Sequence, residues 1–191
     1  MLVFKIVFWV GTVMQVIIRS PFAISARSRN KTEQHGSHLE NILLVLLTIA
    51  AGILPLIYTF TNWLAFANYS LPVWLGWAGV FILIVSLLIF WRAHVDLKAN
   101  WSPSLELYEG HTLITNGIYR FIRHPMYASQ WVWAIAQLML IQNRIAGPAS
   151  QILFLPFYLL RKNAEEKMML EKFDNPYREY MQATGGILPK L

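Results

Sequence analysis

The sequence of 191 residues contains no cysteine. Disulfides, zinc sites built on thiolates and cysteine nucleophiles are therefore all excluded. Charged residues are also scarce, at 14% of the chain, where soluble domains run near a quarter. Hydrophobic residues make up 56% of the chain, and its length suits one domain. This composition predicts an integral membrane protein.

Several common site motifs are missing as well. No G-x-G-x-x-G follows a strand pattern, so a Rossmann nucleotide site is excluded. The five histidines show no metal-binding spacing, and His35, His38 and His94 are more typical of interface residues than of ligands. The net charge of +6 is clustered between apolar segments, which indicates membrane topology rather than nucleic-acid binding. Neither a metal nor a nucleic acid is expected as a partner.

Long apolar runs are the main feature of the sequence. A bilayer core requires about 20 apolar residues in a helix. The last two runs, at about 126–143 and 145–160, are shorter than the others. Only "NRIAGP" connects them, which predicts a tight helical hairpin. We expect a single membrane domain over 1–191, with five spans at about 2–18, 42–60, 71–91, 126–143 and 145–160.

The loops between these runs predict an orientation. Four basic residues lie in 19–40, four in 92–123 and six in the tail from Arg161, whereas 61–71 has no charge. By the positive-inside rule, the N-terminus is outside and the C-terminus is cytoplasmic, with Lys5 as the exception. The membrane would be the inner membrane of a bacterium or the endoplasmic reticulum of a eukaryote.

Two cytoplasmic pieces, 93–124 and 161–191, are left to fold against the membrane face. "SLELYEGHTLIT" predicts a short β-hairpin or an extended loop, and "DNP" at 174–176 ends one helix and begins another. The expected fold is an all-α membrane bundle of about five transmembrane helices. The two pieces would form a small cytoplasmic cap on it.

Polar and amphipathic groups gather where the first piece meets the membrane, at His111, Tyr119, Arg123, His124 and Tyr127. Ionisable groups at such a boundary are unfavourable, and they are by default functional candidates. Pro125 fixes the start of the fourth helix, so His124 stands at its N-terminal end, where free N–H groups can bind an anion. Snorkelling arginine and an aromatic belt explain the same residues about equally well.

A second candidate group begins at Arg161. Arg161 and Glu165 are four residues apart, so an ordinary surface ion pair is the simpler interpretation. However, Arg161 directly follows the apolar run 152–160, which places it at the same membrane boundary as the first group. Because both groups of residues lie at the same membrane boundary, we favour a functional site there over an ordinary surface ion pair.

Three stretches carry a family resemblance: "HTLITNGIYRFIRHPMY", "EEKMMLEKF" and "YREYM". They closely resemble the isoprenylcysteine carboxyl methyltransferase family and the related phospholipid methyltransferases. The resemblance runs from about Arg92 to Pro189 and includes "HVDLKANWS" after the third span. It implies a polytopic enzyme that uses S-adenosyl-L-methionine, enclosed by the two cytoplasmic pieces. A lipophilic substrate would enter from the membrane.

By motif position, the resemblance implies a role for each of several residues. Arg161 and Arg123 are the candidate catalytic residues, and Arg161 and Arg92 are the candidate substrate contacts, although snorkelling explains Arg92 as well. Glu166 is either a supporting partner or a solvated residue. The implied cofactor contacts are His111, Thr112, Leu113, Ile114, Tyr119, His124, Pro125, Met126, Tyr127 and Glu165.

The chemistry of the methyl acceptor distinguishes O-methylation from N-methylation. A carboxylate is ionised at neutral pH and requires no general base, so Arg161 favours O-methylation of a carboxylate such as that of a prenylated cysteine. A phosphatidylethanolamine N-methyltransferase is the alternative, but its ammonium acceptor must first lose a proton. An NADPH-dependent membrane reductase of the sterol reductase type, which resembles the same region, is the second alternative.

Overall fold

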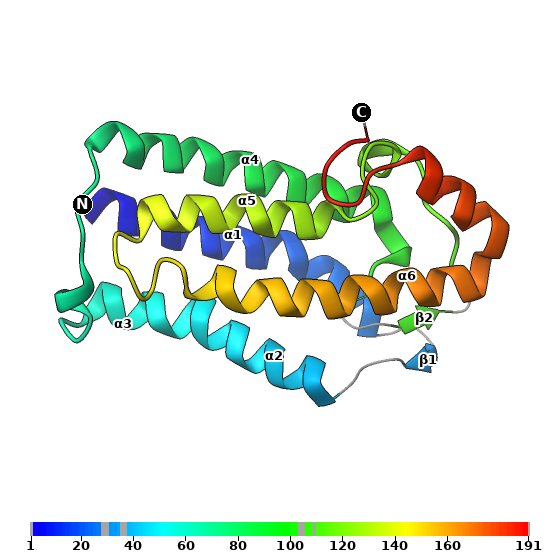
Figure 1. Cartoon of the computed structure of the whole chain (residues 1–191), viewed down its shortest axis with the longest axis horizontal. Helices are drawn as coiled ribbons and strands as arrows, with labels where there is room; N and C mark the ends of the chain where they lie inside the picture. Colours follow the sequence, from blue (N-terminus) through cyan, green and yellow to red (C-terminus); the bar gives the residue numbers. More distant parts are fainter. Residues whose placement is uncertain (1, 28–30, 35–37, 103–105, 109, 191) are drawn as a thin grey trace.

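The computed structural model describes residues 2–27, 31–34, 38–102, 106–108 and 110–190. Most of the described chain is helical (Figure 1). The helices are α1 Leu2–Arg27, α2 His38–Thr48, the π-helical η1 Ile49–Ile53, α3 Leu54–Phe60, the 3-10 helix η2 Ala65–Ala67, α4 Val73–Leu97, the 3-10 helices η3 Lys98–Asn100 and η4 Gly117–Arg120, α5 Pro125–Leu140 and α6 Ala149–Ala183.

Helix α5 is the centre of the bundle. It contacts α1, α4 and α6, and these helices run along the long axis of the molecule (Figure 1). Small residues allow the close approach of α4 and α5: a Cβ at Gly79 would lie only 2.7 Å from the Cβ of Met139. Phe8, Leu83 and Trp133 fill the core between α1, α4 and α5.

Three helical stretches are long and apolar enough to cross a membrane: Leu2–Ala26, His38–Phe60 and Val73–Asn100. They correspond to the first three predicted spans. Helix α5 packs beside them, but its 16 residues extend only about 24 Å, which is less than a typical bilayer core of about 30 Å. The all-α membrane fold is confirmed, while the count of five spans stays a prediction.

The helix ends differ in places from the sequence-based expectation. Helix α1 continues to Arg27, past the end of the predicted span at residue 18, because a helix can run on after its apolar stretch ends. A two-stranded ribbon is the other difference. The strand β2, Glu106–Tyr108, pairs antiparallel with β1, Lys31–Gln34, and not with the residues that follow it. Of the two expectations for this stretch, the local hairpin is wrong, and the extended loop fits residues 111–115, which have no regular secondary structure.

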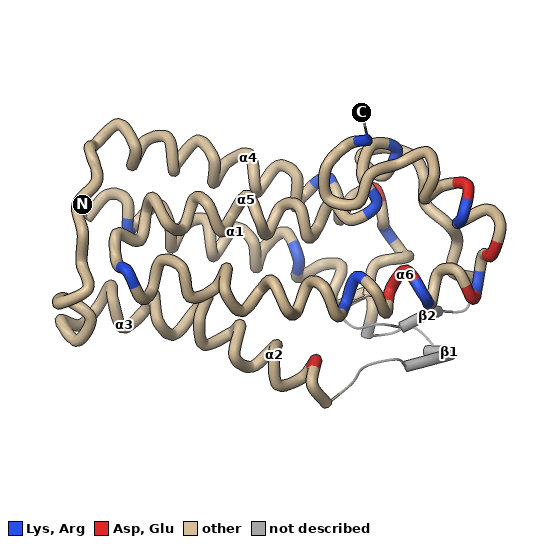
Figure 2. The backbone as a smooth tube through the Cα atoms, in the orientation of Figure 1, with Lys and Arg blue, Asp and Glu red and all other residues tan. Residues whose placement is uncertain are grey.

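The charged residues lie mainly toward one end of the bundle, where the second half of α6 and the segment after α4 meet (Figure 2). Helix α6 bends there at Asp174, whose φ of 42° and ψ of −116° are not helical. Asn175 and Pro176 follow, so the break predicted at "DNP" is confirmed. The bend turns the last part of α6 back toward the start of α5 (Figure 1).

Candidate active site

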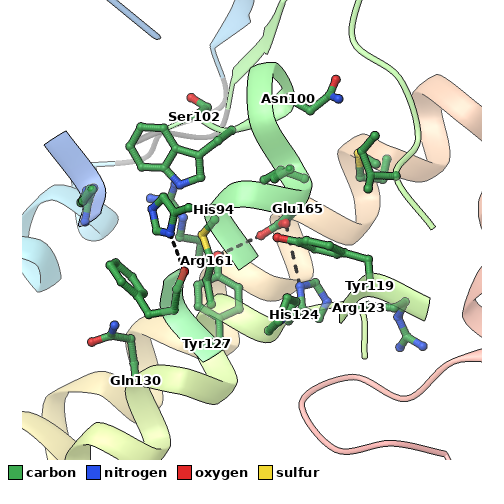
Figure 3. A pocket seen from close by; sticks show the side chains of 18 of the residues that line it. His94, Asn100, Ser102, Tyr119, Arg123, His124, Tyr127, Gln130, Arg161 and Glu165 are labelled. Atoms are coloured by element: carbon green, nitrogen blue, oxygen red, sulfur yellow. Dashed lines mark hydrogen bonds and ion pairs between the residues drawn. The ribbon is translucent and has the colours of Figure 1, made fainter. Parts of the chain in front are cut away.

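A cavity of about 400 Å³ lies at the charged end of the bundle. Figure 3 shows side chains that line it. Its volume is in the usual range for small-molecule sites. Residues from α1, α2, α4, α5 and α6 line it, together with the segment that joins α4 to α5. The lining includes every residue that the resemblance implied for the cofactor, namely His111, Thr112, Leu113, Ile114, Tyr119, His124, Pro125, Met126, Tyr127 and Glu165, and also Arg123 and Arg161.

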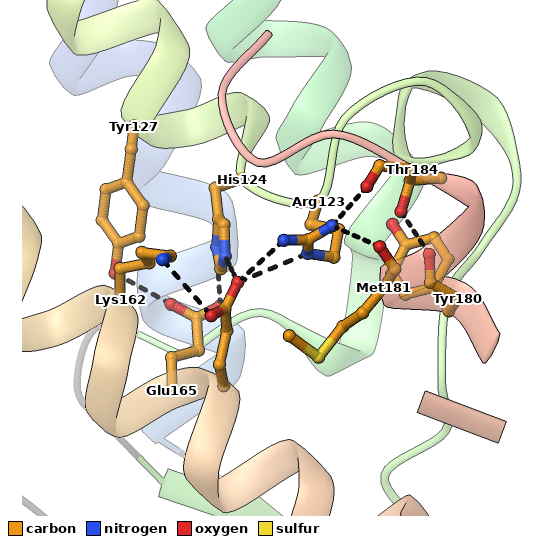
Figure 4. Close-up of polar contacts among 9 residues, drawn as sticks. Arg123, His124, Tyr127, Lys162, Glu165, Tyr180, Met181 and Thr184 are labelled. Atoms are coloured by element: carbon orange, nitrogen blue, oxygen red, sulfur yellow. Dashed lines mark hydrogen bonds and ion pairs between the residues drawn. The ribbon is translucent and has the colours of Figure 1, made fainter. Parts of the chain in front are cut away.

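His124 occupies the N-cap position of α5, as the position of Pro125 predicted, and its side chain makes no capping hydrogen bond. Its Nε2 lies 3.0 Å from Oε1 of Glu166. Because an ionised carboxylate only accepts, Nε2 carries the hydrogen of this bond. The Nδ1 atom is buried without a hydrogen-bond partner, 3.8 Å from Oε1 of Glu165 (Figure 4). A buried nitrogen in this state can accept a polar group of a ligand.

Glu165 is joined to the same helix start through Tyr127. The Tyr127 hydroxyl donates to Oε2 of Glu165 at 2.9 Å. The side chain of Glu165 remains 35% exposed, so it has room for further hydrogen bonds. Because an ionised carboxylate has about four acceptor sites, Glu165 can receive hydroxyl or ammonium donors from a bound molecule.

Glu166 lies beside this group and supports it. Burial raises its pKa, but the hydrogen bond from His124 and the charges of His124, Lys162 and Arg123 outweigh burial and lower the pKa of Glu166 to about 2. Lys162 Nζ is 3.4 Å from Oε2 and Arg123 Nη2 is 3.2 Å from Oε1. Of the two interpretations that the sequence allowed for Glu166, the structure supports the buried partner.

Arg123 connects the start of α5 to the C-terminal tail. Its Nη1 donates to the carbonyl oxygens of Met181, at 3.1 Å, and Thr184 (Figure 4). The backbone N–H groups of Arg123 and His124 donate to the carbonyls of Gly185 and Gly186 at 2.9 and 3.0 Å. These bonds fasten the C-terminal tail to the start of α5, so the two pieces predicted to be cytoplasmic are in direct contact.

The segment of residues 111–114 is held by Asn100, which follows α4. The Asn100 side-chain oxygen accepts from the Thr112 backbone N–H at 2.8 Å. Nδ1 of His111 is buried and has no partner. Burial, with a smaller contribution from Lys172, lowers the pKa of His111 to about 4, so the ring is neutral at pH 7.

Gly117 is required for the turn that places Tyr119. Its φ is 59°, and a Cβ there would lie 2.1 Å from Oδ2 of Asp96. That carboxylate accepts from the backbone N–H of Ile118 at 2.7 Å, which fixes the turn to α4. Burial and then the charge of Glu165 raise the pKa of Tyr119 well above its usual range, so its hydroxyl stays protonated.

Arg161 enters the cavity from α6. It is buried, and its Nη1 donates to Oε1 of Glu40 on α2 at 2.6 Å. Its guanidinium also lies over the ring of Phe157, 5.8 Å from the centroid. An arginine has five N–H donors in a planar fork, so Arg161 can bind Glu40 and still offer donors to an anion in the cavity.

The structure does not bring Arg92 to the residues that line this cavity. Its guanidinium pairs with Asp96 one turn away, at 2.9 Å, and half of its side chain is exposed. This arrangement agrees with the snorkelling interpretation that the sequence also allowed.

Sequence reasoning did not identify several residues of the lining. They come from α1 and α2, which carry no recognisable motif, from α4 and the 3-10 helix η3 that follows it, and from positions on α5 and α6 to which the motifs assigned no role. His94 is the clearest correction: it is 1% exposed and lies inside the protein, not at an interface. The lining residues that sequence reasoning missed include Gln15, Arg19, Leu44, Leu47, His94, Asn100, Gln130, Met168, Tyr177 and Tyr180.

The model of the isoprenylcysteine carboxyl methyltransferase (ICMT) family matches residues 77–171. This range contains α5, the 111–127 motif, Arg161 and Glu165. The match confirms the resemblance that the motifs predicted, and a methyltransferase family implies a methyl donor.

Individual relatives agree with the family model. The protein-S-isoprenylcysteine O-methyltransferase A of Arabidopsis thaliana is 24% identical over 153 residues, which are 79% of this chain and 78% of that protein. The Tribolium castaneum protein-S-isoprenylcysteine O-methyltransferase is 27% identical over 118 residues, 61% of this chain and 42% of that protein. The corresponding Dictyostelium discoideum enzyme is matched over 50% of its length. The chain therefore spans half or less of two of these three relatives.

A solved structure shares the fold. The eukaryotic intramembrane Ras methyltransferase ICMT superposes with a TM-score of 0.50 and 23% sequence identity. The superposition covers 79% of this chain and 51% of that one. The likeness supports the arrangement of the helices.

Proposed function

Because the chain belongs to the isoprenylcysteine carboxyl methyltransferase family through residues 77–171, we propose that it is an S-adenosyl-L-methionine-dependent O-methyltransferase. Its acceptor is the carboxylate of a lipophilic molecule such as a prenylated cysteine. The observation that carries this proposal is the single cavity that joins Arg161 to His124, Tyr127 and Glu165. Arg161 thus supplies a cation for a carboxylate, and His124, Tyr127 and Glu165 offer partners for a polar cofactor in the same cavity.

The residues of the cavity fit this cofactor. S-Adenosyl-L-methionine has an adenine, a ribose and an amino-acid group, and when bound it supplies a methyl group on a cationic sulfur. The unpartnered Nδ1 atoms of His111 and His124 can each meet one of its polar groups. Glu165 can accept from ribose hydroxyls or from the α-ammonium, and the first N–H groups of α5 can bind the α-carboxylate.

Arg161 is assigned to the acceptor. A carboxylate is the attacking group in this reaction and is already ionised at neutral pH, so no residue has to remove a proton from it. Arg161 holds the carboxylate through charge-assisted N–H bonds and fixes the direction in which its oxygen faces the methyl group. We assign Arg123 to positioning, because its guanidinium holds Glu166 and the tail.

The apolar part of the lining excludes water. Phe154, Phe157 and Met169 line the cavity. A carboxylate reacts faster with a cationic sulfonium when both are dehydrated, because their charges cancel as the new bond forms. The same apolar surface can hold the hydrocarbon chain of the acceptor.

The proposed topology follows from the charged end. We assign the end that contains the cavity to the cytoplasm, with the N-terminus outside and the whole chain as one membrane domain. The contact between the segment 111–124 and the tail, through the backbone bonds of Arg123 and His124, supports a cap made of both cytoplasmic pieces.

Methyl transfer from tritiated S-adenosyl-L-methionine tests the activity. The purified protein in lipid nanodiscs is given N-acetyl-S-farnesylcysteine in one reaction and phosphatidylethanolamine in another. We expect base-labile label, released as methanol from an ester, in the first reaction alone. Base-stable label in the phospholipid instead would identify an N-methyltransferase, and label in neither would contradict the proposal.

A further inference from the structure

A second cavity, of about 450 Å³, lies between α1 and α3. The start of α1 and the helix α3 are at the end of the bundle opposite the charged residues (Figure 1). Lys5, Trp9 and Thr59 supply the polar groups of its lining. The rest of the lining is apolar, and each of these side chains is exposed: Leu2, Ile6, Val10, Val13, Met14 and Phe60. The cavity is therefore an open groove, and we call it the α1–α3 groove.

The walls of the α1–α3 groove belong to two stretches that are long and apolar enough to cross a membrane, Leu2–Ala26 and His38–Phe60. Exposed aromatic side chains mark the membrane surface at this end. Trp63 and Phe66 follow α3, Trp74 lies in the first turn of α4, and they are 77%, 81% and 67% exposed. Because tryptophan is enriched where lipid headgroups meet the hydrocarbon, the groove extends from the headgroup level into the hydrocarbon.

Lys5 stands at the headgroup end of this groove and is the exception to the positive-inside pattern of the sequence. Its Nζ donates to the carbonyl oxygen of Tyr58 at 3.2 Å and lies 4.1 Å from the centroid of the Tyr58 ring. An ammonium has three N–H donors, so two remain for a ligand. The first acidic residue of the sequence is Glu33, and none lies between Glu40 and Asp96. Neither α1 nor α3 therefore offers a carboxylate that neutralises Lys5.

We propose that the α1–α3 groove binds a membrane phospholipid with an anionic head, whose phosphate lies on Lys5 and one of whose acyl chains lies along α1. A phosphate neutralises the ammonium and accepts its two remaining N–H groups. The site is separate from the methyltransferase cavity, because the linings of the two cavities share no residue. The inference goes beyond the proposed function and does not depend on it.

The rest of the groove suits a hydrocarbon chain. Ile6, Val10 and Val13 lie on one face of α1 and extend about 10 Å along it. The indole N–H of Trp9 donates to Oγ1 of Thr59 at 3.0 Å, so this N–H is already satisfied within the protein. Hydrocarbon on these side chains then meets apolar surface, and the polar head is required only at Lys5.

Native mass spectrometry of the detergent-solubilised protein with added phosphatidylglycerol tests the site. We expect the wild-type protein to retain one phosphatidylglycerol molecule at the lowest lipid concentrations. Lys5→Gln should weaken this binding about tenfold or more, the usual size of a charge-assisted hydrogen bond that is lost. Lys5→Arg keeps the charge and should keep the binding. Arg144→Gln is the matched control, because Arg144 lies at the same end of the bundle, beside Ala67, and does not line the groove.

A second pair of variants tests the place of the acyl chain. Val10→Trp fills the groove from an exposed position and leaves Lys5 in place, so it should also abolish retention of the lipid. Val73→Trp makes the same change at an exposed position of α4 that lines neither cavity, and it should retain the lipid. Diacylglycerol, which has the chains without the phosphate, should bind at least about tenfold more weakly than phosphatidylglycerol. Inorganic phosphate should not displace the phospholipid.

Four results would overturn the inference. Equal retention by Lys5→Gln and the wild type, or equal binding of diacylglycerol, would show an occupant held by its chains alone. Displacement of the lipid by inorganic phosphate would show a site for a free anion. A mass of two protein copies that Val10→Trp reduces to one would show a second copy of the chain in the groove. A wild-type protein that retains no phosphatidylglycerol would contradict the site itself.

Discussion

Arg161 and Glu40 form a buried ion pair between α6 and α2, with Nη1 and Oε1 2.6 Å apart. The two residues are 121 positions apart in the sequence. The pair fixes a guanidinium at the edge of the cavity and ties the second predicted span to the helix that carries Glu165. The packing of α2 against α6 and the proposed acceptor contact thus involve the same arginine.

Replacing Glu40 should therefore destabilise the fold. Glu40→Ala leaves the buried Arg161 without this carboxylate, and the loss of one partner of a buried pair is worth about 3 kcal/mol. Thermal unfolding in nanodiscs measures the effect. The double variant Glu40→Ala with Arg161→Ala should lose clearly less than the sum of the single variants. Additive losses would show that the pair does not couple α2 to α6.

Arg161 should matter for turnover and not for the cofactor. Arg161→Ala should bind S-adenosylhomocysteine like the wild type but lower kcat/KM for the carboxylate acceptor by about 100-fold or more, since a charge-assisted bidentate contact is lost. Arg161→Lys should recover only part of the rate, because an ammonium cannot form the planar fork. Wild-type turnover in Arg161→Ala would remove the residue from the substrate role.

Glu165 should matter for the cofactor. Glu165→Gln keeps the size of the side chain but removes its charge and half of its acceptor oxygens, so affinity for S-adenosylhomocysteine should fall at least about tenfold. Calorimetric titration gives the value. Glu171→Gln is the matched control, because Glu171 is on the same helix with an exposed side chain paired to Lys167. Equal affinities in the two variants would exclude Glu165 from the cofactor site.

Much of this site could be predicted from the sequence, because its motifs are local. Pro125 marks the start of α5, and "DNP" marks the bend at Asp174; both depend on neighbouring residues alone. The pairing of Glu40 with Arg161 could not be predicted, because it depends on how two distant apolar helices pack. His94 was misjudged for the same reason: its position after a predicted span suggested an interface, whereas aromatic rings from two other segments bury it.

Glu166 should make stability depend on pH in the acidic range. Its pKa is about 2 in the folded protein and about 4.3 in an unfolded chain, so the unfolded state binds the proton first as pH falls. The contribution is complete above about pH 4.5 and is lost as pH falls toward 2. We expect the unfolding temperature of Glu166→Gln to fall less steeply over this interval than that of the wild type. Parallel curves would contradict the lowered pKa.

Gly117 should not tolerate a side chain. Gly117→Ala combines a positive φ, worth about 1–2 kcal/mol, with a clash of its Cβ against Asp96, so the free energy of unfolding should fall by more than about 2 kcal/mol. Two other glycines serve as controls. Gly110→Ala has the positive φ but open space, and should lose about half as much. Gly186→Ala has open space and no positive φ, and should change little. Equal stabilities in all three variants would contradict the assigned turn.

The most direct test of the cofactor site is calorimetric titration of the purified protein with S-adenosylhomocysteine, with NADPH titrated beside it. The cavity formed by His111, His124, Tyr127 and Glu165 predicts saturable binding of S-adenosylhomocysteine at micromolar concentrations and no binding of NADPH. Binding of NADPH alone would contradict the methyltransferase assignment and would direct the search to reducible membrane substrates. Binding of neither compound would contradict the assignment of this cavity to the cofactor.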